Sequence, residues 1–358
     1  MIQKTVLVLI AFVLAYGLYV FPFAALWALF HGTAIFDPQS LPLGVPAFVC
    51  LWLYLRTGTT NRPLKAFVYY GMGIGFIALW VVGLALVAHA LASFESGAVA
   101  AVASTAILVL SAVSLINART ITSRQLVVNS AKISQPVRFA FISDVHIGSH
   151  APQHLAKICD HLITMDVHAV LIGGDLFDSS DVTLDDLKAL KRIKQDIFFI
   201  TGNHEGYVKG HQQMLDQFDG LGITVLDNSA QDFAGINIIG IADSQPVADK
   251  VAAIDSLRQP DTFNLALVHQ PSSWSPARDM VDLMLCGHTH NGQIFPFNFL
   301  VRLQFAQTYG HYGVPGAQLY VSSGAGCWGP GMRLGSRNEI IHLEILPSGD
   351  ILPGACKA

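Results

Sequence analysis

Residues 137–148 read VRFAFISDVHIG, and this stretch decides the fold of the second part of the chain. The apolar run at 137–142 has the length and the residue types of a buried β-strand, and Asp144 and His146 follow it directly. Side chains two residues apart lie on the same face of an extended segment, so this spacing predicts two ligands for one metal ion. Alone the pair is weak evidence, because Asp-x-His often occurs by chance.

Four further motifs place acidic, imidazole or amide side chains after an apolar run. They are Gly174-Asp175-Leu176-Phe177-Asp178, Gly202-Asn203-His204-Glu205, Leu267-Val268-His269-Gln270-Pro271 and Gly287-His288-Thr289-His290. Any one of them is most simply a polar loop at a strand end, but five together make that explanation improbable. Carboxylate, imidazole and amide donors in combination suit a pair of borderline divalent metal ions rather than a cysteine-based structural zinc site.

Apolar runs alternate with helical patterns over residues 119–358. We expect strands at 137–142, 169–172, 197–200, 236–241, 265–268, 283–286, 319–322 and 339–346, and helices at 154–165, 184–194, 211–218 and 249–257. Strands and helices alternate early and strands dominate later, which predicts an α/β fold of two mixed sheets packed together with helices outside.

The composition divides the chain into an apolar part and a water-soluble part. The 358 residues are 52% hydrophobic and 13% charged, too apolar for an ordinary soluble protein. Residues 1–118 hold six charged residues, whereas residues 119–358 hold 17 Lys and Arg against 23 Asp and Glu. We therefore expect two domains, a transmembrane domain at 1–118 and a catalytic domain at 119–358. The acidic balance of the second gives no reason to expect nucleic acid as a partner.

Four apolar stretches are each long enough to cross a bilayer, at 5–30, 35–55, 66–94 and 97–118. The second is the weakest, because Asp37 and three prolines interrupt its first half. Lys and Arg occur before the first stretch, between the second and third, and after the fourth, which places both termini in the cytoplasm. The five cysteines (50, 159, 286, 327 and 356) are scattered, which argues against a disulfide framework and suits a reducing compartment. We expect a multi-pass protein of the cell (inner) membrane with a cytoplasmic catalytic domain. If the second stretch does not cross, the catalytic domain lies outside instead.

In this order, the five motifs resemble the calcineurin-like metallophosphoesterase family, and the resemblance covers roughly residues 136–345. The chain is most similar to membrane-anchored bacterial phosphodiesterases, on the evidence of GHTHNGQ at 287–293, SSGAG at 322–326 and Asn338-Glu339-Ile340. The resemblance implies an α/β/β/α sandwich, here preceded by about four transmembrane helices. Asn291 departs from the closer relatives, which typically have Gly there, and this puts the loop shape in doubt but not metal binding.

The resemblance also implies a role for each site residue. Asp144, His146 and His290 would bind the first metal ion, Asn203, His269 and His288 the second, and Asp175 both. His204 would stand beside the leaving group as proton donor, with Asp178 orienting its imidazole. The two divalent ions would be manganese, iron or zinc, because the ligand set alone does not choose between them.

Two further features leave alternatives open. Residues 293–318 carry little charge and are typical either of a flap facing lipid or a bulky substrate, or of a long loop folded onto the sandwich. The side chains that suggest this are Phe295, Phe297, Phe299, Leu300, Phe305, Tyr309 and Tyr312. Arg333 is a candidate for binding a substrate phosphate, although a solvated surface arginine is the more common outcome.

The sequence therefore predicts a metal-dependent phosphoesterase that hydrolyses a phosphodiester or a pyrophosphate bond. Its anchoring makes a lipid-linked substrate plausible and leaves a soluble nucleotide-type diester open. The alternative is a membrane sensor or scaffold that uses the fold as a binding module. The complete ligand set and His204 argue against it, since a scaffold needs neither. Transport by the four apolar stretches has little support.

Overall fold

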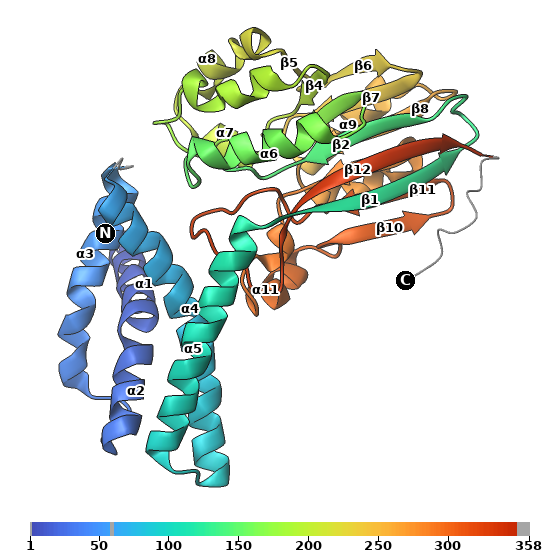
Figure 1. The fold of residues 1–358 in the computed structure, drawn as a ribbon. Coiled ribbons are helices and arrows are strands. Elements are labelled where there is room, and N and C mark those ends of the chain that lie inside the picture. The colour runs from blue at the N-terminus through green and yellow to red at the C-terminus, as the bar shows by residue number, and fades with distance from the viewer. Residues whose placement is uncertain (1, 58–60, 349–358) are drawn as a thin grey trace. The chain divides into compact units, whose positions relative to one another are not determined.

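The computed structural model describes residues 2–57 and 61–348 (Figure 1). The chain forms two compact units, Met1–Asn117 with Gly329–Leu334, and Ala118–Trp328 with Gly335–Ala358. Cys50, Cys159 and Cys286 are free cysteines, while Cys356 lies outside the described residues.

The first unit is helical. Its helices are α1 (Ile2–Tyr19), α2 (Phe21–His31), a 3₁₀ helix (Pro38–Leu43), α3 (Gly44–Thr57), α4 (Arg62–Ala92) and α5 (Ser96–Arg119). Three stretches, Pro38–Arg56, Arg62–Ala92 and Ser96–Arg119, are long and apolar enough to cross a membrane. The pair Thr5–Tyr19 and Phe21–His31, bent by 43°, makes a fourth if it is one span. The structure thus has three to four candidate spans within the described residues, in the regions where the sequence predicts them.

Small residues let these helices approach closely. A Cβ atom on Gly75 of α4 would lie 2.1 Å from the carbonyl oxygen of Leu18 in α1, so only glycine fits at this contact. In helices that lie in lipid, such close backbone approach is a main source of packing energy, because lipid gives no hydrophobic drive for helix association. Buried Ala25, Ala78 and Ala103 continue this small-residue packing between α2, α4 and α5.

The segment Gly329–Leu334 also belongs to the helical unit, although it lies far along the chain. The Arg333 N–H donates to the Ser114 carbonyl oxygen at 2.9 Å, and the Asn117 side chain donates to the Arg333 carbonyl oxygen at 3.2 Å. Arg333 is fully buried. The expectation of a solvated surface arginine is therefore wrong, because these backbone bonds to the last turns of α5 hold the residue inside the unit.

The second unit contains two six-stranded mixed sheets. The first has the order β1-β12-β2-β3-β4-β5 and the second β10-β11-β9-β8-β7-β6. The strands of the first sheet are β1 (Ile121–Ser130), β12 (Asn338–Pro347), β2 (Val137–Ile142), β3 (Ala169–Ile172), β4 (Asp196–Phe199) and β5 (Ile223–Val225). Those of the second are β10 (Gly310–Val314), β11 (Ala317–Val321), β9 (Leu283–Cys286), β8 (Phe263–Val268), β7 (Ile236–Ile241) and β6 (Ser229–Phe233). The predicted pair of packed mixed sheets is confirmed.

Side-chain alternation along the strands builds the layers. In β2, Phe139 and Phe141 point into the core between the two sheets, where they pack with Leu171, Leu265 and other apolar residues. Ala140 and Ile142 of the same strand belong to the core on the outer face of the first sheet. Both faces of the strand are buried from residue 139 to residue 142, which is why this part of its sequence is continuously apolar.

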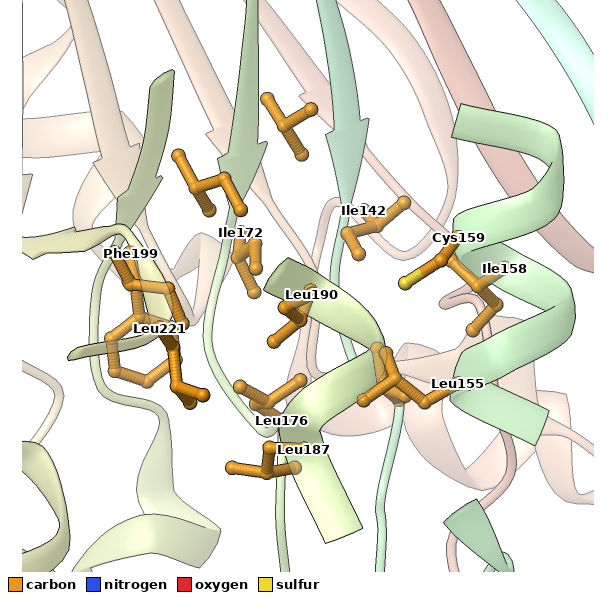
Figure 2. Close-up of a cluster of buried hydrophobic side chains, with 14 of the residues drawn as sticks. Ile142, Leu155, Ile158, Cys159, Ile172, Leu176, Leu187, Leu190, Phe199 and Leu221 are labelled. Carbon is orange, nitrogen blue, oxygen red and sulfur yellow. The ribbon is translucent and has the colours of Figure 1, made fainter. Parts of the chain in front are cut away.

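Helices cover the outer face of each sheet. On the first sheet, α6 (Pro152–Thr164) and the 3₁₀ helix Leu184–Arg192 contribute Leu155, Ile158, Leu187 and Leu190 to one buried cluster (Figure 2). On the second, Ile254 of α9 (Val247–Leu257) packs with residues of β7, β8 and β9. The remaining helices of this unit are short: α7 (Asn203–Tyr207), α8 (His211–Leu215), α10 (Trp274–Ala277) and α11 (Phe297–Gln304).

The sequence misses several edge elements. Six of the ten residues of strand β1 are polar, among them Thr122, Arg124 and Gln125. Only Leu126 and Val128 are buried, so the strand lacks the signal of a buried strand. Between 293 and 318, where the sequence leaves a flap or a folded loop, the structure has the helix α11 and the strand β10. Five of its apolar side chains are exposed: Phe295, Phe297, Phe299, Leu300 and Leu303.

Candidate metal centre

All seven candidate ligands follow the C-terminal ends of parallel strands. In the first sheet, β2, β3 and β4 are parallel neighbours, and Asp144 and His146, then Asp175, then Asn203 follow them in turn. In the second sheet, β8 and β9 are parallel neighbours, followed by His269 and by His288 and His290. Because parallel strands end at the same edge of a sheet, this topology gathers side chains that are up to 146 residues apart in sequence.

The backbone at the ligands is not extended. Five of the seven have positive φ angles: 54° at Asp144, His146 and Asp175, 72° at His288 and 48° at His290. The expectation that Asp144 and His146 share a face through strand alternation is therefore wrong. Left-handed turns direct the two side chains instead. Non-glycine residues seldom adopt this conformation, and such strain concentrates at functional sites.

One group of donors consists of Asp144, His146 and His290. The Nε2 atoms of His146 and His290 are 3.1 Å apart, and the Nε2 atom of His290 is 3.5 Å from the Asp144 carboxylate. Asp144 and His146 are fully buried. The Asp144 carboxylate also accepts the backbone N–H of His288 at 2.9 Å, which links this group to the next.

The other group consists of Asp175, His269 and His288, with Asn203 beside them. The Asn203 side-chain oxygen is 3.1 Å from His269 Nε2 and 2.8 Å from His288 Nδ1. The Asp175 carboxylate is 3.1 Å from His269 Nε2 and 3.7 Å from His146 Nε2, so it lies between the two groups.

Asp178 and His204 lie beside these groups. They form a cluster with His146 whose ligand atoms are all within 4.8 Å of one another. The Asp178 carboxylate accepts the Ser149 N–H at 2.7 Å and lies 3.2 Å from His146 Nδ1. His204 is half-buried, and its backbone N–H donates to the Asp175 carboxylate at 2.9 Å.

Glu205 is a functional residue to which the sequence assigns no role. Its fully buried carboxylate accepts four backbone N–H groups, those of Asp175, Leu176, Phe177 and Gly202, at 2.6–3.1 Å. It thereby ties the loop after β3 to the loop after β4. Burial, together with the charge of Asp175, raises the pKa of Glu205 to about 7. Its position next to His204 in the motif is the only sequence signal for this role.

Burial and neighbouring charges shift the pKa values of the residues in the site. Burial and the neighbouring His269 lower the pKa of His288 to about 4, so its ring is neutral near pH 7, the form that binds a metal ion. Burial also lowers the pKa of His204. Burial alone would raise the pKa of Asp175, but the His269 imidazolium and its hydrogen bond outweigh burial and hold that pKa below its ordinary value.

The donor chemistry fits divalent metal ions. His269 Nδ1 lies 2.8 Å from the Gly173 carbonyl oxygen, so Nδ1 carries a proton, and Nε2 faces the oxygens of Asp175 and Asn203. As an imidazolium, the ring donates its Nε2–H to these oxygens; a divalent ion bound there would replace that proton and take Nε2 and the oxygens as ligands. The Nε2 atoms of His146 and His290 face each other at 3.1 Å, where both could be ligands of one ion. Hydrogen bonding of the second ring nitrogen to a carbonyl is how proteins orient metal-binding histidines.

Known proteins are similar to the part of the chain that holds these residues. A family model described as calcineurin-like phosphoesterase matches residues 137–292, which include every candidate ligand. A protein from Escherichia coli named phosphodiesterase YaeI is 32% identical, over 59% of this chain and 83% of its own length. The chain belongs to the calcineurin-like metallophosphoesterase family.

Two further relatives cover a comparable share of this metallophosphoesterase. An uncharacterized metallophosphoesterase of Helicobacter pylori is 36% identical, over 60% of this chain and 61% of its own length. A cattle protein, named transmembrane protein with metallophosphoesterase domain, is 29% identical, over 66% of this chain and 60% of its own length. The chain thus spans about three fifths of the length of several of these relatives.

Proposed function

We propose that this metallophosphoesterase uses two divalent metal ions to hydrolyse a phosphodiester or a pyrophosphate bond. The observation that carries the proposal is the pair of donor groups joined by the Asp175 carboxylate. Asp144, His146 and His290 would bind one ion and Asn203, His269 and His288 the other, with Asp175 shared. When bound, such an ion pair polarises a phosphoryl oxygen and lowers the pKa of water. Manganese, iron and zinc all suit these ligands.

His204 would supply the proton for the leaving group. Water adds its oxygen to phosphorus and releases a proton to solvent, and the bond from phosphorus to the leaving oxygen breaks. That oxygen takes a proton from the protonated form of the imidazole, which solvent then reprotonates. The products are a phosphomonoester and an alcohol, or two phosphates from a pyrophosphate. Proton transfer of this kind typically contributes 10²–10⁴-fold to the rate. Asp178, within 4.8 Å of His204 and 3.2 Å from His146, would position these rings.

The domain limits and the membrane orientation belong to the same proposal. Residues 1–118 would anchor residues 119–358 at the cytoplasmic face of the cell membrane, in agreement with the positions of Lys and Arg. Three to four candidate spans and a relative named as a transmembrane protein support the anchoring. A catalytic domain held at a bilayer favours a lipid-linked substrate, and we expect no nucleic-acid partner.

The test uses the full chain purified in detergent, stripped of metal and then loaded with manganese. Hydrolysis of bis-p-nitrophenyl phosphate is measured beside metal content for His204→Ala and Asp175→Asn. We expect His204→Ala to keep its metal and lose roughly 10²-fold or more in rate, and Asp175→Asn to lose both. His211→Ala is the control, since its half-buried imidazole bonds only to the Val208 carbonyl oxygen among the contacts described.

Three outcomes would contradict the proposal. If the protein does not bind manganese, zinc or iron, the proposed ligands are wrong. If it binds two ions per chain but hydrolyses neither diesters nor pyrophosphates, the sensor or scaffold function replaces it. If His204→Ala retains full activity, another group donates the proton.

A further inference from the structure

Two large aromatic side chains beside His204 are left exposed. Tyr207 is 74% exposed and Trp328 is 53% exposed. Their ring centroids lie 5.4 Å and 5.6 Å from that of the His204 imidazole. Exposed aromatic rings next to a proposed proton donor have no role in packing the core. Tyr and Trp are the residues whose rings offer an apolar face with a polar edge, as binding surfaces require.

The backbone of Trp328 is fixed relative to the metal centre. The Gln293 side-chain amide accepts the Trp328 N–H and donates to the Trp328 carbonyl oxygen, both at 3.0 Å. Gln293 lies three residues beyond His290 and bonds to its carbonyl oxygen. Two residues before the tryptophan, the Gly326 N–H donates to the Asp144 carbonyl oxygen at 2.9 Å. Both attachments lead to candidate ligands, so the position of Trp328 is set by the same loops that set the site.

Tyr207 is fixed in a similar way. It is the last residue of α7, whose first residue is the candidate ligand Asn203. The buried carboxylate of Glu205 holds the start of this helix through the Gly202 N–H at 2.7 Å. Tyr207 therefore cannot move far from His204 without disturbing the loop after β4.

We infer that Tyr207 and Trp328 form the binding surface for an apolar leaving group of the substrate. This inference rests on the proposed function, in which His204 protonates the leaving oxygen. An oxygen close enough to take that proton places its substituent beside the His204 ring, where the two aromatic side chains lie. Burying the substituent against them removes apolar surface from water on both sides of the contact.

An acyl chain and a flat ring system both provide this chemistry. Three exposed apolar side chains follow Gln293 in the sequence. They are Phe295, Phe299 and Leu303, and Leu303 is 84% exposed. The rings of Phe295 and Phe299 pack against each other at 5.6 Å. This continuation suits a long acyl chain, while an aromatic group would use only the first two rings.

The test asks which of two phenols leaves from a mixed diester. Phenyl para-octylphenyl phosphate and phenyl naphthyl phosphate each carry two leaving groups of similar acidity but different apolar size. Their products distinguish which bond broke. This ratio is measured within one sample, so partial unfolding or incomplete metal loading does not change it. The full chain is used in detergent with manganese.

We expect the wild-type protein to release the larger phenol in roughly 2- to 10-fold excess, the range of an aromatic contact. Tyr207→Ala and Trp328→Ala should bring the ratio toward one, and Trp328→Phe should restore it. Ile163→Ala, 40% exposed at the end of α6, is the control. If the product ratio is larger for the octylphenyl compound, the surface binds an acyl chain. If it is larger for the naphthyl compound, the surface binds a flat ring system. A ratio that neither alanine variant changes overturns the inference.

A second measurement distinguishes failure of the proposed function from failure of this inference. If the manganese-loaded protein hydrolyses neither compound, titration calorimetry with naphthyl phosphate and para-octylphenyl phosphate tests the surface by binding alone. The Kd should weaken roughly 2- to 10-fold in Tyr207→Ala and Trp328→Ala. An unchanged Kd, or no binding by the wild-type protein, overturns the inference without reference to catalysis.

Discussion

Replacing Gly174 with alanine should disturb the metal centre from a position that carries no ligand. Gly174 has a φ angle of +89° and precedes Asp175. A Cβ atom there would lie 2.7 Å from the Gly202 nitrogen and 2.8 Å from His269 Nδ1. The optimal separation of non-bonded heavy atoms is about 3.5–4.0 Å, so the Gly202 nitrogen and the His269 ring would have to move away by about 0.7 Å or more.

The energetic cost has two parts. A left-handed backbone costs an alanine about 1–2 kcal/mol, and overpacking a filled interior costs about 1–3 kcal/mol more. The sum, about 2–5 kcal/mol, corresponds to a Tm roughly 5–15 °C lower for a domain of this size. Displacing His269 would also break its 2.8 Å bond to the Gly173 carbonyl oxygen and shift a candidate ligand. A misplacement near 1 Å can cost roughly 10²-fold in rate.

Two quantities are measured for each variant. The Tm is followed by intrinsic fluorescence, and the metal content is determined by mass spectrometry. Gly206→Ala is the control, because a Cβ atom on Gly206, in α7, meets no atom within 4 Å. That variant should keep its metal and unfold at the same temperature or slightly higher, since alanine favours a helix. A Gly174→Ala protein with the Tm and the metal content of Gly206→Ala would refute the packing argument.

Two further predictions concern the sandwich away from the candidate metal ligands. The buried carboxylate of Glu339 accepts hydrogen bonds from the Tyr309, Tyr320 and Ser322 hydroxyls and from the Ser323 N–H, and it pairs with the exposed Arg124. Because Glu339→Ala removes the acceptor of buried donors, it should cost about 3–5 kcal/mol in the free energy of unfolding. The measurement is unfolding in urea, with Glu344→Ala as the control. That variant loses a 3.4 Å contact with Gln125 and should change the free energy of unfolding by less than about 0.5 kcal/mol. Equal losses of stability in the two variants would contradict the prediction. Burial raises the pKa of Cys159 to about 12, so at pH 8 only about one thiol in 10⁴ is ionised, against about one in ten for a free cysteine. Maleimide labelling followed by peptide mass spectrometry should therefore modify Cys159 only in denaturant, and labelling of the native protein at the rate of a free cysteine would exclude this burial.

The two-sheet fold was predictable because continuous apolar runs such as residues 139–142 bury both of their faces. The candidate ligands were predictable because each follows such a run. Their backbone conformation was not, since the left-handed turns at Asp144 and His146 have no glycine to indicate them. Contacts between distant segments were equally hidden: nothing local to Arg333 indicates Ser114 as its partner.

The exposed rings of Tyr207 and Trp328 were missed for a related reason. A single aromatic residue in a loop has the same local signal whether it fills a core or faces a site. Only the folded structure shows that both rings lie next to His204 and therefore face the site. The edge strand β1 was missed because sheet edges carry fewer apolar residues, so periodicity is weakest there.

The packing of Gly329–Leu334 with the helices sets an order of events during synthesis of the chain. The last helix, α5, leaves the ribosome roughly 210 residues before Arg333, a delay of roughly 10–40 s at ordinary translation rates. Throughout that time Ser114 and Asn117 lack the backbone partners that they have in the finished protein. The helical unit therefore reaches its final form only after the translation of nearly the whole metallophosphoesterase sandwich, and a ribosome that stalls within the sandwich leaves the helices unfinished as well.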